Sequence, residues 1–127
     1  NYGWHLGMAF QMADDLLDYT ATADQLGKNP GADMREGKLT LPLIYSLGKA
    51  DARDREWMLT AMARPQFEPA AFQGLKERLT RLGGIEYTNN RALGHVQSAR
   101  SVLDIFPESA SKHLLELIAD YSILRKV

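Results

Sequence analysis

Three aspartates close a helix-forming segment that is otherwise apolar on almost every side. Residues 4–19 are rich in Met, Ala and Leu, which predicts a largely buried helix. With a rotation of about 100° per residue, Asp14, Asp15 and Asp18 share an arc of about 100° on that helix. The opposite side is apolar and should pack in the core, so the acidic face is expected to point inward or into a cleft.

The acidic face extends backwards along the same helix over two glycines that are flanked by a phenylalanine and a glutamine. These residues suggest the floor of a groove, and they are Gly3, Gly7, Phe10 and Gln11.

The three carboxylates repel one another, and the negative end of the helix dipole adds to that repulsion. A cation is therefore expected to compensate them. Closely spaced hard oxygen ligands suit Mg²⁺, which is commonly shared between carboxylates and the phosphates of a substrate. The alternative is that these aspartates form only the solvated end of a helix.

Residues 20–37 combine Gly and Pro with polar side chains, which predicts a long loop. Lys28, Arg35 and Lys38 stand among its glycines, where close backbone approach and mobile cations suit phosphate oxygens. The spacing does not match a Walker loop. The alternative is a solvated surface loop, but acidic helix and basic loop together favour a metal–diphosphate site.

The rest of the chain also has helical rather than alternating patterns. Pro42 and Gly48 frame a short helix, and Asp51 can cap the next one, to about Arg64. Further helices are expected over 69–82, 85–105 and 108–124. The predicted fold class is all-α.

Composition excludes several classes of function. The 127 residues include 15 basic and 16 acidic side chains, for a net charge of −1, which disfavours binding to nucleic acid. The absence of cysteine excludes thiolate chemistry and is compatible with a cytoplasmic location. No apolar run approaches the ~20 residues of a transmembrane segment. The three histidines have no second ligand at i+3 or i+4 and are predicted to be structural.

Three consecutive segments carry a resemblance to a known family. They are GMAFQMADDLLDY at 7–19, LGKNPGAD at 26–33 and REGKLTLPL at 35–43. Together they resemble the second aspartate-rich region of trans-type polyprenyl diphosphate synthases. Residues 83–88 and 117–121 are similar to the C-terminal helices of that family, particularly of its long-chain branch, typified by octaprenyl diphosphate synthase.

The resemblance implies the isoprenoid-synthase helical bundle and a prenyltransferase reaction. In that reaction isopentenyl diphosphate is condensed head to tail with an allylic diphosphate, with Mg²⁺ as the cofactor, to give a polyprenyl diphosphate. It also implies a cytoplasmic homodimer that associates weakly with membranes through its lipid product.

The family's functional residues map onto this chain by matched position. Asp14, Asp15 and Asp18 would hold the metal against the allylic diphosphate. Lys28 and Lys38 would bind its phosphate oxygens. The residues implied to line the isopentenyl side of the cleft are Phe10 and Gln11.

The family has an earlier aspartate-rich motif, whereas this chain has only one. Residues 1–127 are therefore expected to form the C-terminal part of a single polyprenyl synthetase domain whose first aspartate-rich half is absent, and the chain alone is expected to be inactive. The alternatives are a non-catalytic subunit of a heteromeric synthase and a class I terpene cyclase. Non-catalytic subunits tend to lose the metal ligands, and cyclases usually mix Asn, Ser or Thr and Glu in their second motif.

Overall fold

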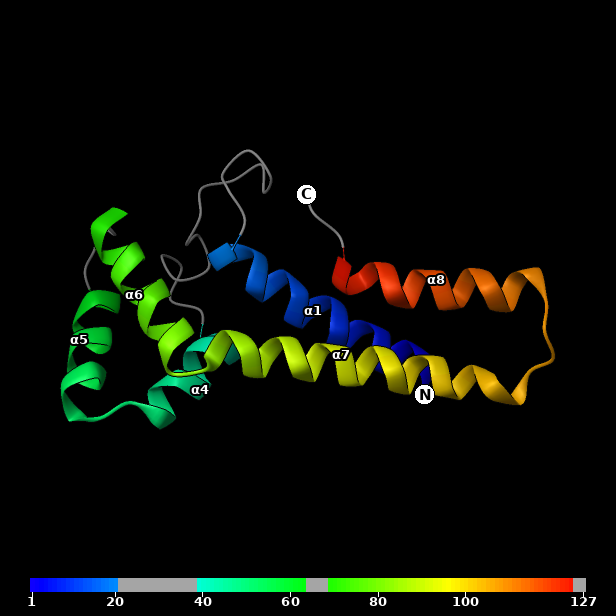
Figure 1. Ribbon diagram of the computed structural model, residues 1–127, viewed down its shortest axis with the longest axis horizontal. Helices are drawn as coiled ribbons and strands as arrows, with labels where there is room; N and C mark the ends of the chain where they lie inside the picture. Colours follow the sequence, from blue (N-terminus) through cyan, green and yellow to red (C-terminus); the bar gives the residue numbers. More distant parts are fainter. Residues whose placement is uncertain (21–38, 64–68, 125–127) are drawn as a thin grey trace.

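The computed structural model describes residues 1–20, 39–63 and 69–124, and gives only the backbone of Asp18, Thr20 and Pro69. Within these ranges the chain is all-α, as predicted (Figure 1). The elements are α1 (Tyr2–Thr20), α4 (Leu41–Lys49), α5 (Ala52–Met62), α6 (Pro69–Arg81), α7 (Gly84–Val102), the 3₁₀ turn η1 (Leu103–Ile105) and α8 (Ala110–Leu124). The loop predicted over 20–37 lies outside the described residues from Ala21 onward.

Helix α1 connects two apolar clusters. Near its start it packs with α7 and α8 through small side chains, so the three helices approach closely; the buried residues of this cluster are Ala9, Val96, Ala99 and Ala119. Its last turn enters a second cluster, built with α4, α5 and α6, whose buried residues are Tyr19, Leu43, Met58, Phe72, Leu75 and Leu79. Figure 1 shows α1 beside α7, with α4, α5 and α6 gathered at one end of the molecule.

Two of the helix boundaries that differ from the prediction have a local reason. The α-helical part of α7 ends at Val102 and continues as η1, because Phe106, which precedes Pro107, has an extended backbone. Helix α8 begins at Ala110 rather than at Glu108. The Ser109 hydroxyl accepts a hydrogen bond from the Lys112 backbone N–H at 3.1 Å, so Ser109 caps the helix and Glu108 precedes it.

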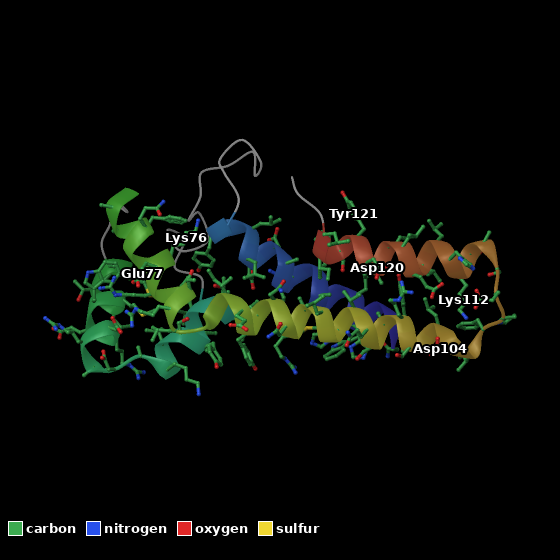
Figure 2. The ribbon with its side chains drawn as sticks, in the orientation of Figure 1. Lys76, Glu77, Asp104, Lys112, Asp120 and Tyr121 are labelled. Carbon is green, nitrogen blue, oxygen red and sulfur yellow. The ribbon has the colours of Figure 1, made fainter. Side chains whose placement is uncertain are left out.

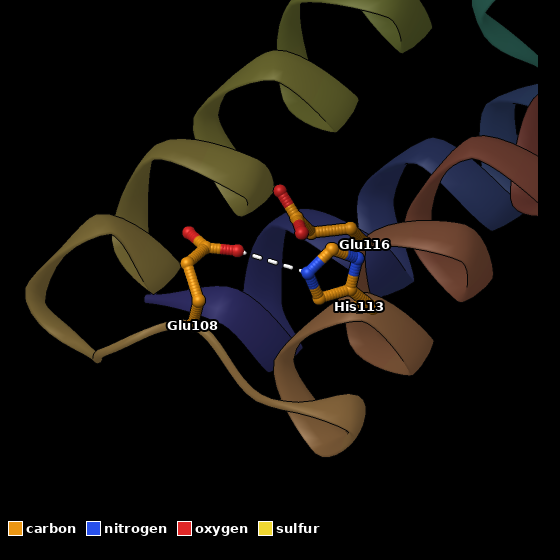
Figure 3. Close-up of side chains that lie close together, drawn as sticks. All are labelled: Glu108, His113 and Glu116. Carbon is orange, nitrogen blue, oxygen red and sulfur yellow. Dashed lines mark hydrogen bonds and ion pairs between the residues drawn. The ribbon is translucent and has the colours of Figure 1, made fainter.

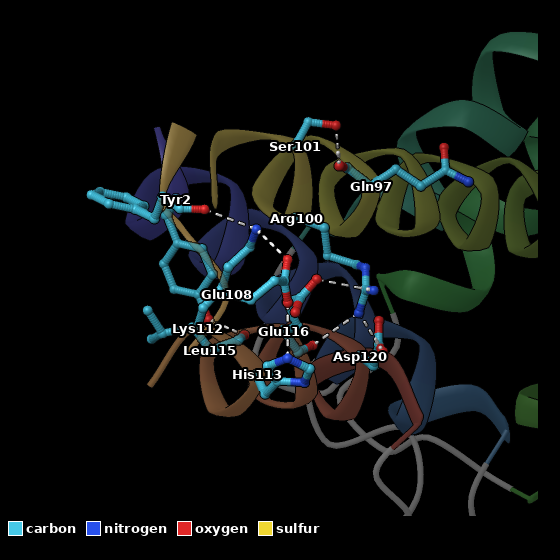
Figure 4. Close-up of polar contacts among 11 residues, drawn as sticks. Tyr2, Gln97, Arg100, Ser101, Glu108, Lys112, His113, Leu115, Glu116 and Asp120 are labelled. Carbon is cyan, nitrogen blue, oxygen red and sulfur yellow. Dashed lines mark hydrogen bonds and ion pairs between the residues drawn. The ribbon is translucent and has the colours of Figure 1, made fainter. Parts of the chain in front are cut away.

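Helix α8 faces α7 with charged side chains. The Arg100 guanidinium donates hydrogen bonds to Asp120 Oδ2 at 2.8 Å and to Glu116 Oε2 at 3.3 Å (Figure 4). The outward face of α8 is instead apolar. Figure 2 shows Tyr121 projecting away from the bundle. The large apolar side chains exposed on α8 are Leu114, Leu115, Leu117, Ile118, Tyr121 and Leu124.

An ion-pair network joins α5 to α6. The Arg81 Nη2 atom donates to Asp54 Oδ1 at 2.9 Å, and Arg78 Nε lies 3.3 Å from the same oxygen while its guanidinium stacks on Trp57. The hydrogen bond from Arg81 is the largest of the influences that hold the pKa of the Asp54 carboxyl below its usual range. The carboxylate form therefore stabilises the folded state.

This lowered pKa predicts a specific pH dependence of stability. Because the pKa of Asp54 is lower in the folded chain than in the unfolded chain, its contribution is complete above the unfolded value of about 3.9 and is lost as the pH falls through the folded value. Urea unfolding measures the difference in the free energy of unfolding between wild type and Asp54→Asn. This difference should shrink as the pH falls from about 5 to about 2, a range that spans the unfolded pKa of about 3.9. A difference that stays constant over that range would contradict this role.

Candidate functional site

The carboxylates of Asp14 and Asp15 lie near the C-terminal end of α1 and are both half-buried. The Gln11 amide Nε2 donates a hydrogen bond to Asp15 Oδ1 at 3.0 Å, which orients that carboxylate along the helix. Because α1 is continuous from Tyr2 to Thr20, Asp14, Asp15 and Asp18 share one face of its backbone, as predicted. The side chain of Asp18 lies outside the described part of the structure.

The side of α1 opposite the carboxylates is buried, also as predicted. Ala9, Met12 and Ala13 are all nearly inaccessible to solvent. This packing leaves the acidic side directed away from the core formed with α7 and α8.

The glycine face that leads to the carboxylates is open in the described structure. A Cβ atom added at Gly3 or Gly7 would meet nothing within 4 Å. Phe10 is 48% exposed, and Gln11 is also exposed. The described residues therefore place Phe10 and Gln11 on an open surface beside the carboxylates, and their role on the isopentenyl side of a cleft stays a prediction.

The cations expected to complete the site, Lys28 and Lys38, lie outside the described residues.

The donor set at Asp14 and Asp15 fits a hard divalent cation. Carboxylate oxygens are the ligands that Mg²⁺ prefers, and two adjacent carboxylates leave coordination positions for water or phosphate oxygen. The last turn of α1 contains no basic residue, so the helix itself supplies no side-chain cation against its negative dipole end. Asp14 and Asp15 could therefore hold such a cation, and the role predicted for Asp18 lies with a side chain outside the described structure.

Among the described residues, a second group of possible metal ligands lies at the opposite end of the molecule. Glu108, His113 and Glu116 bring one ligand atom each within 4.8 Å of one another (Figure 3). The prediction that no histidine has a second possible ligand at i+3 or i+4 is wrong for His113, because Glu116 follows it by three residues on α8.

Cationic side chains already contact both carboxylates of that group. Lys112 Nζ donates to Glu108 Oε1 at 3.0 Å, and Arg100 Nη2 donates to Glu116 Oε2 (Figure 4). The hydrogen bond from Lys112 is the largest influence lowering the pKa of Glu108. We therefore assign the group a structural role in fastening the start of α8.

The other two histidines pair with each other. His5 Nδ1 and His95 Nδ1 lie 3.0 Å apart, and the Trp4 ring meets both imidazoles edge to face. Burial is the largest influence lowering the pKa of His95. A neutral imidazole in this pair allows one ring to donate and the other to accept, which links α1 to α7.

Comparison with known proteins identifies the relatives of this chain. A family model described as polyprenyl synthetase matches residues 1–78. A prenyl transferase of Cyanophora paradoxa is 36% identical over 126 residues, which cover 98% of this chain and 37% of that protein. The octaprenyl diphosphate synthase of Escherichia coli is 35% identical over 98% of this chain and 38% of its own length.

Solved structures agree with this result. A polyprenyl synthase from Caulobacter crescentus, crystallised with calcium and isoprenyl diphosphate, superposes with a TM-score of 0.90 at 36% identity. The match covers 100% of this chain and 39% of that one. The chain thus spans a little over a third of the length of the curated relatives that it matches. Within the described residues, no helix is long and apolar enough to cross a membrane.

Proposed function

Because this chain belongs to the polyprenyl synthetase family, we propose that it supplies the part of a prenyltransferase that binds Mg²⁺ and the diphosphate of an allylic substrate. The observation that carries the proposal is the pair of half-buried carboxylates on α1, in a helix whose other side is anchored in the core. The calcium and isoprenyl diphosphate in the Caulobacter crescentus enzyme support a divalent cation and a diphosphate as ligands of the fold.

The proposed reaction is the condensation of an allylic diphosphate with isopentenyl diphosphate. The allylic carbon–oxygen bond breaks, diphosphate leaves, the isopentenyl double bond attacks the allylic carbon, and a proton is lost. When bound, Mg²⁺ would supply positive charge that stabilises the departing diphosphate. Asp14, Asp15 and Asp18 would hold the metal, and Lys28 and Lys38 would bind phosphate oxygens.

The residues of the chain then have distinct tasks. Gln11 orients the Asp15 carboxylate through its hydrogen bond, and the buried side of α1 holds the helix in place. Phe10, on the open face, would contact the second substrate. Residues 1–127 would act as the C-terminal part of one polyprenyl synthetase domain, and the homodimer, cytoplasmic location and weak membrane association belong to the same proposal.

Calorimetric titration of the purified chain with inorganic pyrophosphate tests the proposed site. Binding should require Mg²⁺ and should disappear when EDTA removes the metal. Binding that survives chelation, or no binding at any Mg²⁺ concentration, would contradict the proposal. In the same preparation, Mg²⁺, isopentenyl diphosphate and an allylic primer should give no chain elongation; measurable turnover would show that the chain is not merely part of an active site.

A further inference from the structure

A buried hydrogen bond joins the end of α1 to the start of α4. The Tyr19 hydroxyl lies 3.1 Å from Thr40 Oγ1, although the two residues are 21 positions apart in the sequence. Tyr19 is 1% exposed and Thr40 is 6% exposed. A buried hydroxyl group that lacks a hydrogen-bond partner destabilises the folded state. The two hydroxyl groups are therefore held to this mutual hydrogen bond.

Packing alone does not account for the Tyr19 hydroxyl. The ring stacks nearly parallel on Phe72, with centroids 6.3 Å apart, inside the cluster formed with α4, α5 and α6. A phenylalanine would fill the same apolar space. Packing therefore explains the aromatic ring of Tyr19 but not the presence of its hydroxyl group.

Thr40 departs from the usual behaviour of a residue at its position. It is the N-cap of α4, where a threonine side chain normally accepts a hydrogen bond from a backbone N–H of its own helix. Thr40 makes no such side-chain cap bond, and its hydroxyl contacts Tyr19 instead. The side chain thus links two helices rather than capping one.

The position of Tyr19 on α1 connects this link to the carboxylates. Tyr19 follows Asp15 by four residues, which is about one turn of the same helix. Anchoring Tyr19 against α4 limits rotation and fraying of the last turns of α1. These turns carry Asp15 and Asp14, whose oxygens must keep a fixed direction to share a cation.

We propose that Tyr19 and Thr40 are positioning residues, whose hydrogen bond holds the aspartate face of α1 in the orientation that binds a Mg²⁺–diphosphate complex. This inference rests on the proposed function, because it concerns the orientation of the same carboxylates. It assigns to two residues outside the aspartate motif a share in the affinity of the site.

The test compares Mg²⁺-dependent binding of inorganic pyrophosphate by the 127-residue chain and its variants. Tyr19→Phe and Thr40→Val should each weaken binding about tenfold, at the lower end of the 10–100-fold seen when outer-shell partners of a metal site are lost. The double variant should bind no more weakly than either single variant, because both remove one interaction. Thr40→Ser keeps the hydroxyl group and should therefore bind pyrophosphate with the affinity of wild type.

A core variant separates positioning from stability. Leu79→Val shortens a fully buried side chain of the same cluster without touching the hydrogen bond, and it should lower the urea midpoint while leaving pyrophosphate affinity unchanged. Equal weakening by Leu79→Val, or wild-type affinity in both Tyr19→Phe and Thr40→Val, would overturn the inference. If wild-type chain itself fails to bind pyrophosphate with Mg²⁺, the proposed function fails instead.

Discussion

Asp15→Asn should weaken Mg²⁺-dependent binding of inorganic pyrophosphate by about 100-fold, since loss of an outer-shell partner alone costs 10–100-fold and this change removes the charge of a ligand. Asparagine has nearly the same shape, and its side-chain oxygen can still accept the hydrogen bond from Gln11. The loss would therefore report on charge rather than on packing. Asp14→Asn should have a similar effect, and calorimetry at several Mg²⁺ concentrations measures both.

An aspartate far from the site provides the matched control. Asp104 lies on η1 at the opposite end of the molecule and is exposed (Figure 2). Asp104→Asn makes the same change of net charge as Asp15→Asn. Because salt screens distant surface charges, the affinity of this variant for pyrophosphate should stay within about twofold of wild type. Wild-type affinity in both Asp14→Asn and Asp15→Asn would rule out a metal site on this face of α1.

Gly84→Ala should lower the free energy of unfolding by about 3 kcal/mol, the upper part of the range for overpacking a well-packed contact. Gly84 is buried at the start of α7, where α4 passes directly over it. A Cβ atom there would overlap Ser46 Oγ and the carbonyl oxygen of Pro42, and would lie 3.1 Å from the carbonyl carbon of Pro42. Backbone atoms of a helix cannot yield as a flexible side chain can, so α4 would have to move away from α7.

Gly94→Ala is the control on the same helix. A Cβ at Gly94 would meet nothing within 4 Å, and an alanine in a helix interior is more favourable than glycine by about 0.5–1 kcal/mol. Urea unfolding should therefore show opposite signs for the two variants. Equal stability of Gly84→Ala and Gly94→Ala would mean that α4 does not approach α7 as closely as described.

Helix positions were predictable because their signals are local. Asp51 accepts a hydrogen bond from the Asp54 backbone N–H at 2.8 Å, as its place before α5 suggested. Gly83 adopts a positive φ of 88° between α6 and α7, a conformation that glycine adopts without strain. The predicted start of α8 at Glu108 is two residues too early, because Ser109 supplies the cap and the helix begins at Ala110.

Contacts between helices could not be inferred in the same way. Helical periodicity shows which side of a helix is apolar, but it does not show which other helix covers that side. The pairing of Tyr19 with Thr40, the approach of α4 to Gly84 and the histidine pair between α1 and α7 all join residues far apart in sequence. Each depends on how several elements pack together.

The proposed site shows the same division between local and tertiary information. The chemistry of three carboxylates on one helical face follows from residue types and spacing, because the geometry of an α-helix is nearly invariant. The direction of that face follows from tertiary packing: burial of Ala9, Met12 and Ala13 turns the carboxylates away from the core, and the Tyr19–Thr40 contact anchors the end of the helix that carries them. A helix can rotate about its axis without any change in its local geometry, so only contacts with neighbouring helices select one orientation.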